Sequence, residues 1–281
     1  MYDDWMATTA VSAATTDQRG LRGDNDLMVR RWVVDAARAG ALTTWAQPLY
    51  RVSGELDGCE VLARCVFPDG SLRSPDAFAA AFGQSSDWWH LDSSMLVAAV
   101  RLSTRLYQPL GGPLTVAWNA TASSLSRGYT SLLAASIVSL GASPSSLCLE
   151  LTEHVPLLDP VGISVLREVR ELGVKLALDD IGESYAVFRR LRDVGFDRVK
   201  IDRRLTADIV TREGATLIGH VIELSHDLGA EVVAEGVETE AERDALLALG
   251  CDVIQGNLLG AAAPAEHFSE RAASGHRVSM N

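Results

Sequence analysis

The sequence has no uninterrupted apolar run that approaches the roughly 18 residues of a membrane-spanning helix. Residues 1–5 are acidic, and no basic segment followed by an apolar stretch occurs there, so a signal peptide is not predicted. The composition, 47% apolar and 22% charged, is typical of a soluble folded protein. We therefore expect a cytoplasmic protein that does not insert into a membrane.

Cysteine is scarce, and the pattern of a zinc site is missing. The four cysteines form no CxxC pair and lie mostly inside apolar runs, which predicts small, reduced core residues. The six histidines share no metal-ligand spacing. The cysteines are Cys59, Cys65, Cys148 and Cys251.

Positive charge is also in short supply. The chain has 25 Lys and Arg against 37 Asp and Glu, which gives a formal net charge of −12. Affinity for duplex nucleic acid depends on basic side chains that neutralise phosphates, so we expect no such partner. A small anionic nucleotide remains compatible, because divalent metals held by clustered carboxylates would reverse the local field.

Six short apolar runs between residues 116 and 255 each end on a carboxylate, amide or ammonium side chain. Such runs predict strands buried on both faces, as in a parallel sheet covered by helices. The alternation favours a βα barrel or a doubly wound sheet, and both folds place their site at the carboxyl ends of the strands. The runs are Val116–Asn119, Leu147–Glu150, Val174–Asp180, Arg198–Asp202, Glu231–Glu235 and Asp252–Gln255.

We expect one domain, residues 25–281, preceded by a loose tail at residues 1–24 that is rich in small and polar residues. Two further strands, 45–52 and 58–65, precede the six runs and are joined by a turn. Helices are predicted between the strands. They are expected near 27–40, from 74, at 90–108, 128–140, 160–172, 185–193 and 212–228, from 239, and at 264–272.

Oxygen-bearing side chains stand at or near the ends of different predicted strands: Glu60, Asn119, Glu150 and Asp179. Hard divalent metals prefer oxygen ligands, and a barrel would bring these side chains together. Any one alone is weak evidence, since a pair such as Asp179–Asp180 is usually a solvated turn.

The chain has only two lysines, and both lie in apolar strands. An inward-facing Lys200 among carboxylates is predicted to position a water or a phosphate. Lys175 lies four residues before the acids of its strand, which predicts a place on the surface or at the bottom of a barrel.

At these residues the chain resembles the EAL family, bacterial phosphodiesterases and receptors for cyclic di-GMP. The resemblance covers roughly residues 27–270, and the order and separation of the motifs agree. The matching pieces are Gln47-Pro48, Glu60-Val61-Leu62 followed by Arg64, Asn119, Glu150-Leu151-Thr152-Glu153, Asp179-Asp180, Lys200-Ile201-Asp202, Glu235-Gly236-Val237-Glu238-Thr239 and Gln255-Gly256.

The resemblance implies a modified TIM (β/α)8 barrel with one antiparallel strand and two bound Mg²⁺ or Mn²⁺ ions. It implies that the first metal is held by Glu60, Asn119, Glu150 and Asp179, and the second by Asp179, Asp180 and Glu235. Lys200 and Gln255 would then orient the attacking water or its metals. The implied reaction is hydrolysis of cyclic di-GMP to linear pGpG.

The resemblance also assigns residues to the substrate and to a loop. Arg64 would bind a phosphate bidentately. Gln47 and Leu62 would line the nucleotide pocket, and Asp202 would also contact the substrate. Glu153 would tether the loop that follows Asp180.

Departures from the family pattern cluster at residues 181–187, where the family usually reads FGTGYSS and this chain reads IGESYAV. Ser184 replaces a glycine whose freedom at positive φ that loop would use. The altered loop suggests reduced activity or a weakened homodimer. A non-hydrolysing EAL module that senses cyclic di-GMP or binds a protein partner is therefore the alternative. A third interpretation is an enolase-type barrel with one Mg²⁺ and Lys200 as base.

Overall fold

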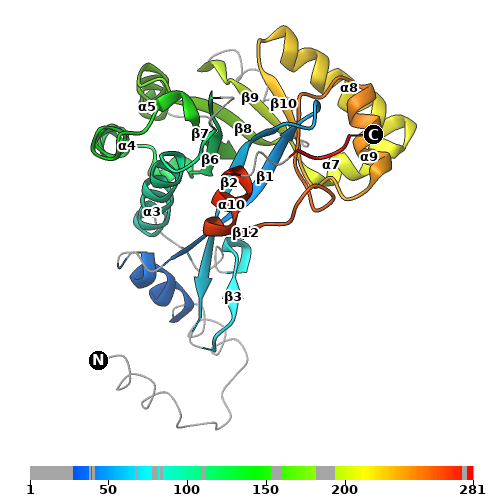
Figure 1. The fold of residues 1–281 in the computed structure, drawn as a ribbon. Coiled ribbons are helices and arrows are strands. Elements are labelled where there is room, and N and C mark those ends of the chain that lie inside the picture. The colour runs from blue at the N-terminus through cyan, green and yellow to red at the C-terminus, as the bar shows by residue number, and fades with distance from the viewer. Residues whose placement is uncertain are drawn as a thin grey trace, which may run out of the picture.

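Eight strands close into a barrel in the described part of the chain (Figure 1). The computed structural model describes residues 28–37, 39, 42–67, 69–77, 82, 85–108, 112–152, 160–181, 194–273 and 277–280. Neighbours around the barrel run in the order β1-β11-β10-β9-β8-β7-β6-β2, and β2 pairs again with β1. Closure excludes the doubly wound sheet.

One strand of the barrel runs against the others. β1 pairs antiparallel with both β2 and β11, whereas the remaining neighbours are parallel. This is the modified TIM barrel with one antiparallel strand that was predicted. The strands are β1 (Thr43–Arg51), β2 (Leu56–Val66), β6 (Thr115–Asn119), β7 (Leu147–Thr152), β8 (Lys175–Ile181), β9 (Arg198–Ile201), β10 (Glu231–Ala234) and β11 (Val253–Ile254).

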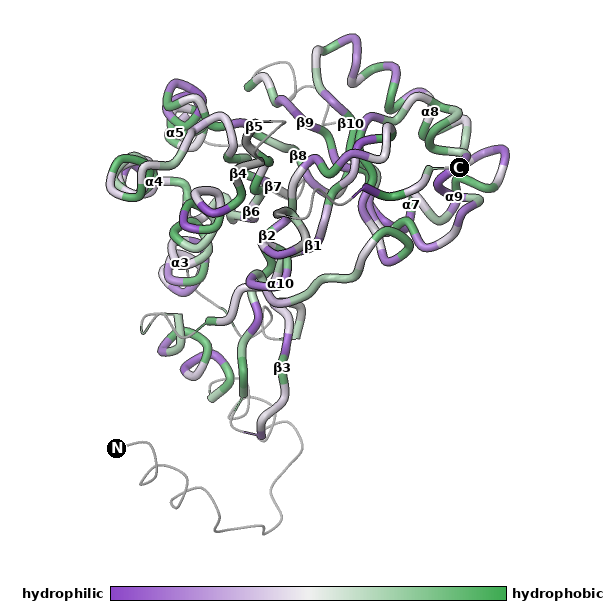
Figure 2. Tube along the Cα trace, in the orientation of Figure 1, coloured by the Kyte–Doolittle hydropathy of each residue, from purple (hydrophilic) through white to green (hydrophobic). Residues whose placement is uncertain are grey.

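Helices cover the outside of the barrel. Figure 1 shows α3, α4 and α5 together on one side and α7, α8 and α9 on the other. Figure 2 shows purple and green alternating along these helices, as expected when one face is packed and the other is exposed. The helices are residues 28–37, α3 (Ser85–Ser103), α4 (Arg127–Leu140), α5 (Pro160–Glu171), α7 (Arg203–Ala207), α8 (Arg212–Asp227), α9 (Glu240–Ala248) and α10 (Ala265–Ala273).

The helix predicted at 90–108 lies about one turn earlier than expected, and its last five residues are not helical. The hydroxyls of Ser103 and Thr104 bond back to the carbonyls of Val100 and Arg101, each at 2.9 Å, so side chains satisfy the end of the helix. The chain then forms a short hairpin of β4 (Tyr107–Gln108) and β5 (Gly112–Pro113). Two further short strands, β3 (Leu72–Arg73) and β12 (Ala263–Pro264), pair with β2 and β1. The helix predicted at 185–193 lies outside the described residues.

The barrel interior is built in layers, because residues two apart on a strand face the same side. The middle layer is apolar and consists of two small groups: Leu49, Val233 and Val253, and Ala117, Cys148 and Ala177. Below it, toward the amino ends of the parallel strands, lies a layer of ion pairs. The guanidinium of Arg198 reaches Asp57 at 2.8 Å and Glu231 at 3.1 Å, and that of Arg51 reaches the same two acids at 2.8 and 3.0 Å.

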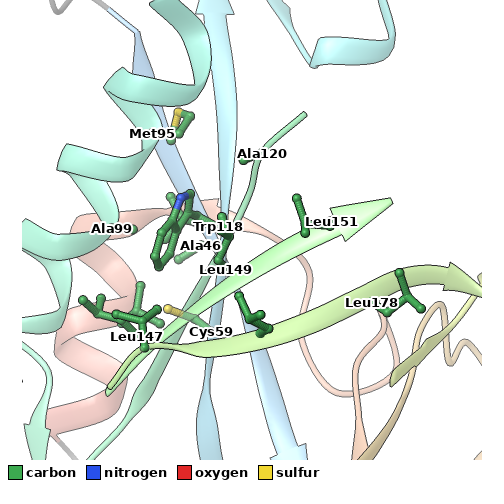
Figure 3. Packing of buried hydrophobic residues seen from close by; sticks show 14 of the residues in the cluster. Ala46, Cys59, Met95, Ala99, Trp118, Ala120, Leu147, Leu149, Leu151 and Leu178 are labelled. Carbon is green, nitrogen blue, oxygen red and sulfur yellow. The ribbon is translucent and has the colours of Figure 1, made fainter. Parts of the chain in front are cut away.

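The main core lies between the barrel and its helices. Figure 3 shows Trp118 of β6 directed at α3, beside Met95 and Ala99. Its indole nitrogen donates to the hydroxyl of Tyr129 on α4 at 2.9 Å, so no polar atom of this buried side chain is left unpaired. All four cysteines are buried and free, which confirms their predicted place in the core. Within the described segments, no helix has the length and apolarity to cross a bilayer.

Candidate active site

The carboxyl ends of the barrel strands bring four carboxylates around one ammonium group. We call these five side chains the Lys200 cluster. From Nζ of Lys200, the carboxylate oxygens lie at 2.5 Å (Glu235), 2.7 Å (Glu150), 3.2 Å (Asp179) and 3.6 Å (Glu60). Lys200 is 1% exposed. The structure therefore places this lysine inside the barrel among carboxylates, as predicted.

Amide side chains complete the cluster on the side of β1, β2 and β6. Nδ2 of Asn119 donates to Oε1 of Glu60 at 2.7 Å, and Nε2 of Gln255 donates to Oε2 of Glu60 at 2.9 Å. The same nitrogen of Gln255 lies 3.1 Å from Oε1 of Gln47, whose own Nε2 donates to the carbonyl of Gly260. Oε1 of Gln255 is buried and has no hydrogen-bond partner in the described structure, so it is ready to accept from a bound water.

Backbone pairing explains why these side chains meet. Asn119 lies opposite Glu150 in the parallel register of β6 and β7, and the amide of Ala120 donates to the carbonyl of Glu150 at 3.0 Å. Glu235 follows β10 directly, and its amide donates to the carbonyl of Ile201 at 3.1 Å. Gly236 then turns the chain at a φ of +67°, where a Cβ atom would lie 2.3 Å from that of Arg203, so glycine is required.

The Lys200 cluster holds more acidic groups than basic ones, and its members are largely removed from water, which shifts the pKa values of several of them. Burial alone would lower the pKa of Lys200, but the carboxylates around it, Asp179 first, raise it well above its usual value. Burial raises the pKa of Glu150 to about 8 against the opposing attraction of Lys200. Burial likewise raises the pKa of Glu235 well above its usual value. A lysine held in its charged form is a fixed cation and hydrogen-bond donor, so the enolase-type interpretation with Lys200 as base is not supported.

The donor set fits divalent metal ions by its chemistry. One ammonium opposes four carboxylates, and a hard cation with oxygen ligands would supply the missing positive charge. In the geometry seen here, Lys200 takes up the space among the acids. No three His, Cys, Asp or Glu side chains of the described residues are grouped as metal ligands. Glu60, Asn119, Glu150, Asp179 and Glu235 are the described residues that could hold metal after small rearrangements, and this assignment stays a prediction.

The predicted substrate residues Leu62, Arg64 and Asp202 lie on the rim of the site, on β2 and at the start of α7. Leu62 and Arg64 follow Glu60 along β2, both half-buried. The guanidinium of Arg64 donates to the carbonyl of Ala63 at 2.8 Å and lies 5.6 Å from the ring centre of Trp45. Asp202 caps α7, accepting from the backbone and side-chain nitrogens of Arg204 at 3.0 and 2.8 Å. Its contact with substrate stays a prediction.

Several predicted residues lie outside the described part of the chain. Glu153 and residues 182–187 of the altered loop are among them, and the side chain of Asp180 is not described although its backbone belongs to β8. Their predicted roles are therefore untested. Lys175, by contrast, starts β8 and is half-buried, which agrees with its predicted place toward the bottom of the barrel.

One buried acid beside the site was not predicted. Asp92 of α3 is 4% exposed and accepts from the backbone nitrogen and the hydroxyl of Thr121 at 2.8 and 2.9 Å. Burial raises its pKa to about 6. Thr121 comes two residues after Asn119, so Asp92 fixes the segment that holds this amide. No pattern in the sequence marks Asp92 as buried, because acids are common on exposed helix faces.

Comparison with known proteins identifies the family. The EAL domain profile matches residues 30–262, and the chain therefore belongs to the EAL domain family, as the motifs predicted. The cyclic di-GMP phosphodiesterase RocR of Pseudomonas aeruginosa is 31% identical over 247 residues, which cover 84% of this chain and 62% of that protein. The signaling protein YkoW of Bacillus subtilis is 30% identical over 234 residues, 80% of this chain and 28% of that protein. The chain thus spans less than two thirds of both relatives.

Solved structures agree on the architecture. The PaMucR phosphodiesterase in its c-di-GMP complex superposes with a TM-score of 0.74 at 27% identity, covering 88% of this chain and 98% of that one. The EAL enzyme Bd1971, in a form bound to cAMP and cyclic di-GMP, reaches a TM-score of 0.82 over 96% of this chain and 72% of that one. Its 20% identity supports the fold alone.

Proposed function

We propose that this protein is a divalent-metal-dependent phosphodiesterase that hydrolyses cyclic di-GMP to linear pGpG. The Lys200 cluster is the observation that carries the proposal, because it gathers four carboxylates and a fixed cation at the carboxyl ends of the barrel strands. Membership of the EAL family and the likeness to RocR support the choice of substrate. Mg²⁺ and Mn²⁺ are the proposed ions, since the candidate ligands are all oxygen donors.

The product defines which bond is broken. In pGpG the 5′ phosphate is retained, so a water oxygen forms a bond to phosphorus while the bond to the 3′ sugar oxygen breaks. Metal ions bound by the carboxylates would acidify the attacking water and neutralise charge on the phosphate. Asp180, whose side chain is not described, is proposed as a further ligand from the family resemblance.

The chain's own residues would position and stabilise these reacting groups. The ammonium of Lys200 remains charged and lies among the carboxylates, where it would donate to the attacking water and stabilise negative charge on the phosphate. The unpaired oxygen of Gln255 would accept a hydrogen bond from the same water. Arg64 and Gln47 would hold the second phosphate and the nucleotide at the rim.

A direct assay tests the proposal. The purified protein is incubated with cyclic di-GMP and Mg²⁺ or Mn²⁺, and products are separated by reversed-phase chromatography. We expect pGpG, and none in excess chelator. Glu60→Gln should abolish most of the activity, whereas Glu213→Gln, on the exposed face of α8, is the matched control and should not. Binding of cyclic di-GMP without any turnover would replace the proposal with the receptor alternative.

A further inference from the structure

Trp45 lies on the strand face that carries the site. β1 is regular from Thr43 to Leu49, so the pleat places Trp45 on the same side as Gln47, whose amide reaches the Lys200 cluster through Gln255. Ala46, between them, points the other way into the core between barrel and helices. Across the sheet, Trp45 lies opposite Leu62 of β2 and Pro264 of β12. The indole is thus at the rim, next to the predicted nucleotide residues.

Trp45 differs from Trp32, Trp88, Trp89 and Trp118, each of which has a hydrogen bond from its indole or an aromatic ring against it among the described residues. Trp118 is buried and bonded to Tyr129, Trp32 donates to the carbonyl of Val66, and Trp88 packs edge-on against Phe82. Trp45 is only half-buried, and its indole nitrogen makes no hydrogen bond to any described residue. A large amphipathic ring left in this way at the mouth of a site offers a face for a planar ligand.

Arg64 links this ring to phosphate recognition. Its guanidinium lies 5.6 Å from the ring centre of Trp45, within the range of a cation–π interaction. The ring therefore helps to hold the guanidinium at the rim, four residues beyond Glu60 on the same strand. A nucleotide placed here would present its phosphate to Arg64 while its base meets the indole.

We propose that Trp45 is a specificity-determining residue of this site, a stacking platform for one purine base of a guanine dinucleotide whose phosphate is bound by Arg64. The inference rests on the proposed function and deepens it by assigning the base contact. Stacking far from the reacting phosphorus stabilises the bound substrate and the transition state equally. It therefore lowers KM and leaves kcat unchanged.

Steady-state kinetics on Trp45 variants test the platform. Trp45→Ala should raise KM for cyclic di-GMP by at least about fivefold, the lower end of the loss expected for one stacked base, with kcat within about twofold. Trp45→Phe keeps an aromatic face and should stay within about fivefold of the wild-type KM. Trp88→Phe, outside the barrel on α3, is the matched control and should change neither constant.

These measurements distinguish failure of the proposed phosphodiesterase function from failure of the stacking role of Trp45. Wild-type protein without turnover would refute the proposed function, whereas active wild type with an unaltered KM in Trp45→Ala would overturn the platform alone. A kcat that falls as far as KM rises would also overturn it, because Trp45 would then be acting on the reacting groups. Should Trp45→Ala fail to fold, Trp45→Leu keeps the apolar contact with Leu62 and Pro264. It should then show the same rise in KM relative to Trp45→Phe.

Discussion

Replacing Lys200 by methionine should destabilise the metal-free protein severely. The substitution keeps a similar apolar volume and removes the ammonium that lies within 3.6 Å of four carboxylates. Breaking a buried ion pair from one side costs about 3–5 kcal/mol, because the partner charge is left uncompensated. Part of that cost is avoided at pH 7, because Glu150, whose pKa is about 8, already carries its proton there and leaves less negative charge to compensate. We therefore expect a loss of about 3 kcal/mol at pH 7 and a larger loss at pH 9. Removing the ammonium raises the pKa of Glu150 further, so the folded variant keeps a proton that the wild type releases above about pH 8, and its stability falls more steeply as the pH rises.

The assay is urea unfolding of the wild type and of Lys200→Met in the presence of chelator, at pH 7 and pH 9. Lys175→Met is the matched control, since it removes the only other lysine of the chain from a half-buried position at the start of β8. The control should lose less than about 1 kcal/mol, the value of an exposed charge pair. Saturating Mg²⁺ should recover part of the lost stability in Lys200→Met, because the metal restores positive charge among the acids.

Equal stability of Lys200→Met and the wild type in chelator at pH 9 would refute this reasoning. It would mean that the carboxylates are not held together by the ammonium. A loss that did not depend on pH would contradict the raised pKa of Glu150. The same loss in Lys175→Met would show that any lysine deletion weakens the barrel.

Three further predictions concern charge in and near the site. Glu60→Gln should lower kcat about 100-fold, since a strong electrostatic contact to the transition state is worth about 2.7–4 kcal/mol; an active variant would overturn its role. Apparent Mg²⁺ affinity, measured by calorimetry, should increase as the pH rises through about 8, because Glu150 must lose its proton to bind metal; a flat profile would contradict this. Asp92 has a raised pKa of about 6, so its stabilising contribution is present below about pH 4 and is lost as the pH rises through 6. Asp92→Asn should therefore gain roughly 3 kcal/mol relative to the wild type between pH 4 and pH 7, and parallel stability curves would argue against it.

The positions of the barrel strands could be predicted from the sequence, because parallel strands that are buried on both faces consist of short apolar runs. Each of the six runs falls on a barrel strand, and the ends of four of them, Asn119, Glu150, Glu235 and Gln255, take part in the Lys200 cluster or bond to it. Lys200 could be placed as well, because a lysine inside an apolar strand has few alternatives to an ionic partner. The C-terminal end of α3 could not be predicted. It depends on hydrogen bonds from the hydroxyls of Ser103 and Thr104 to backbone carbonyls, which end the helix although the apolar pattern continues.

Contacts between segments that are far apart in the chain could not be predicted from the sequence. The ion-pair layer of Asp57 and Arg198 joins residues far apart in the chain, and neither has a local pattern that marks it as buried. Asp92 is hidden for the same reason on a helix. The position of Trp45 at the site could have been predicted. It lies two residues before Gln47 on the same strand, and residues two apart on a strand face the same side.

The most direct test of the central claim is hydrolysis of cyclic di-GMP in ¹⁸O-labelled water with Mg²⁺ or Mn²⁺, followed by mass spectrometry of the product. Attack of water on phosphorus predicts linear pGpG with one ¹⁸O atom in its 5′ phosphate, and no product in excess chelator. Intact cyclic di-GMP with both metals present, or pGpG formed without the label, would contradict the account.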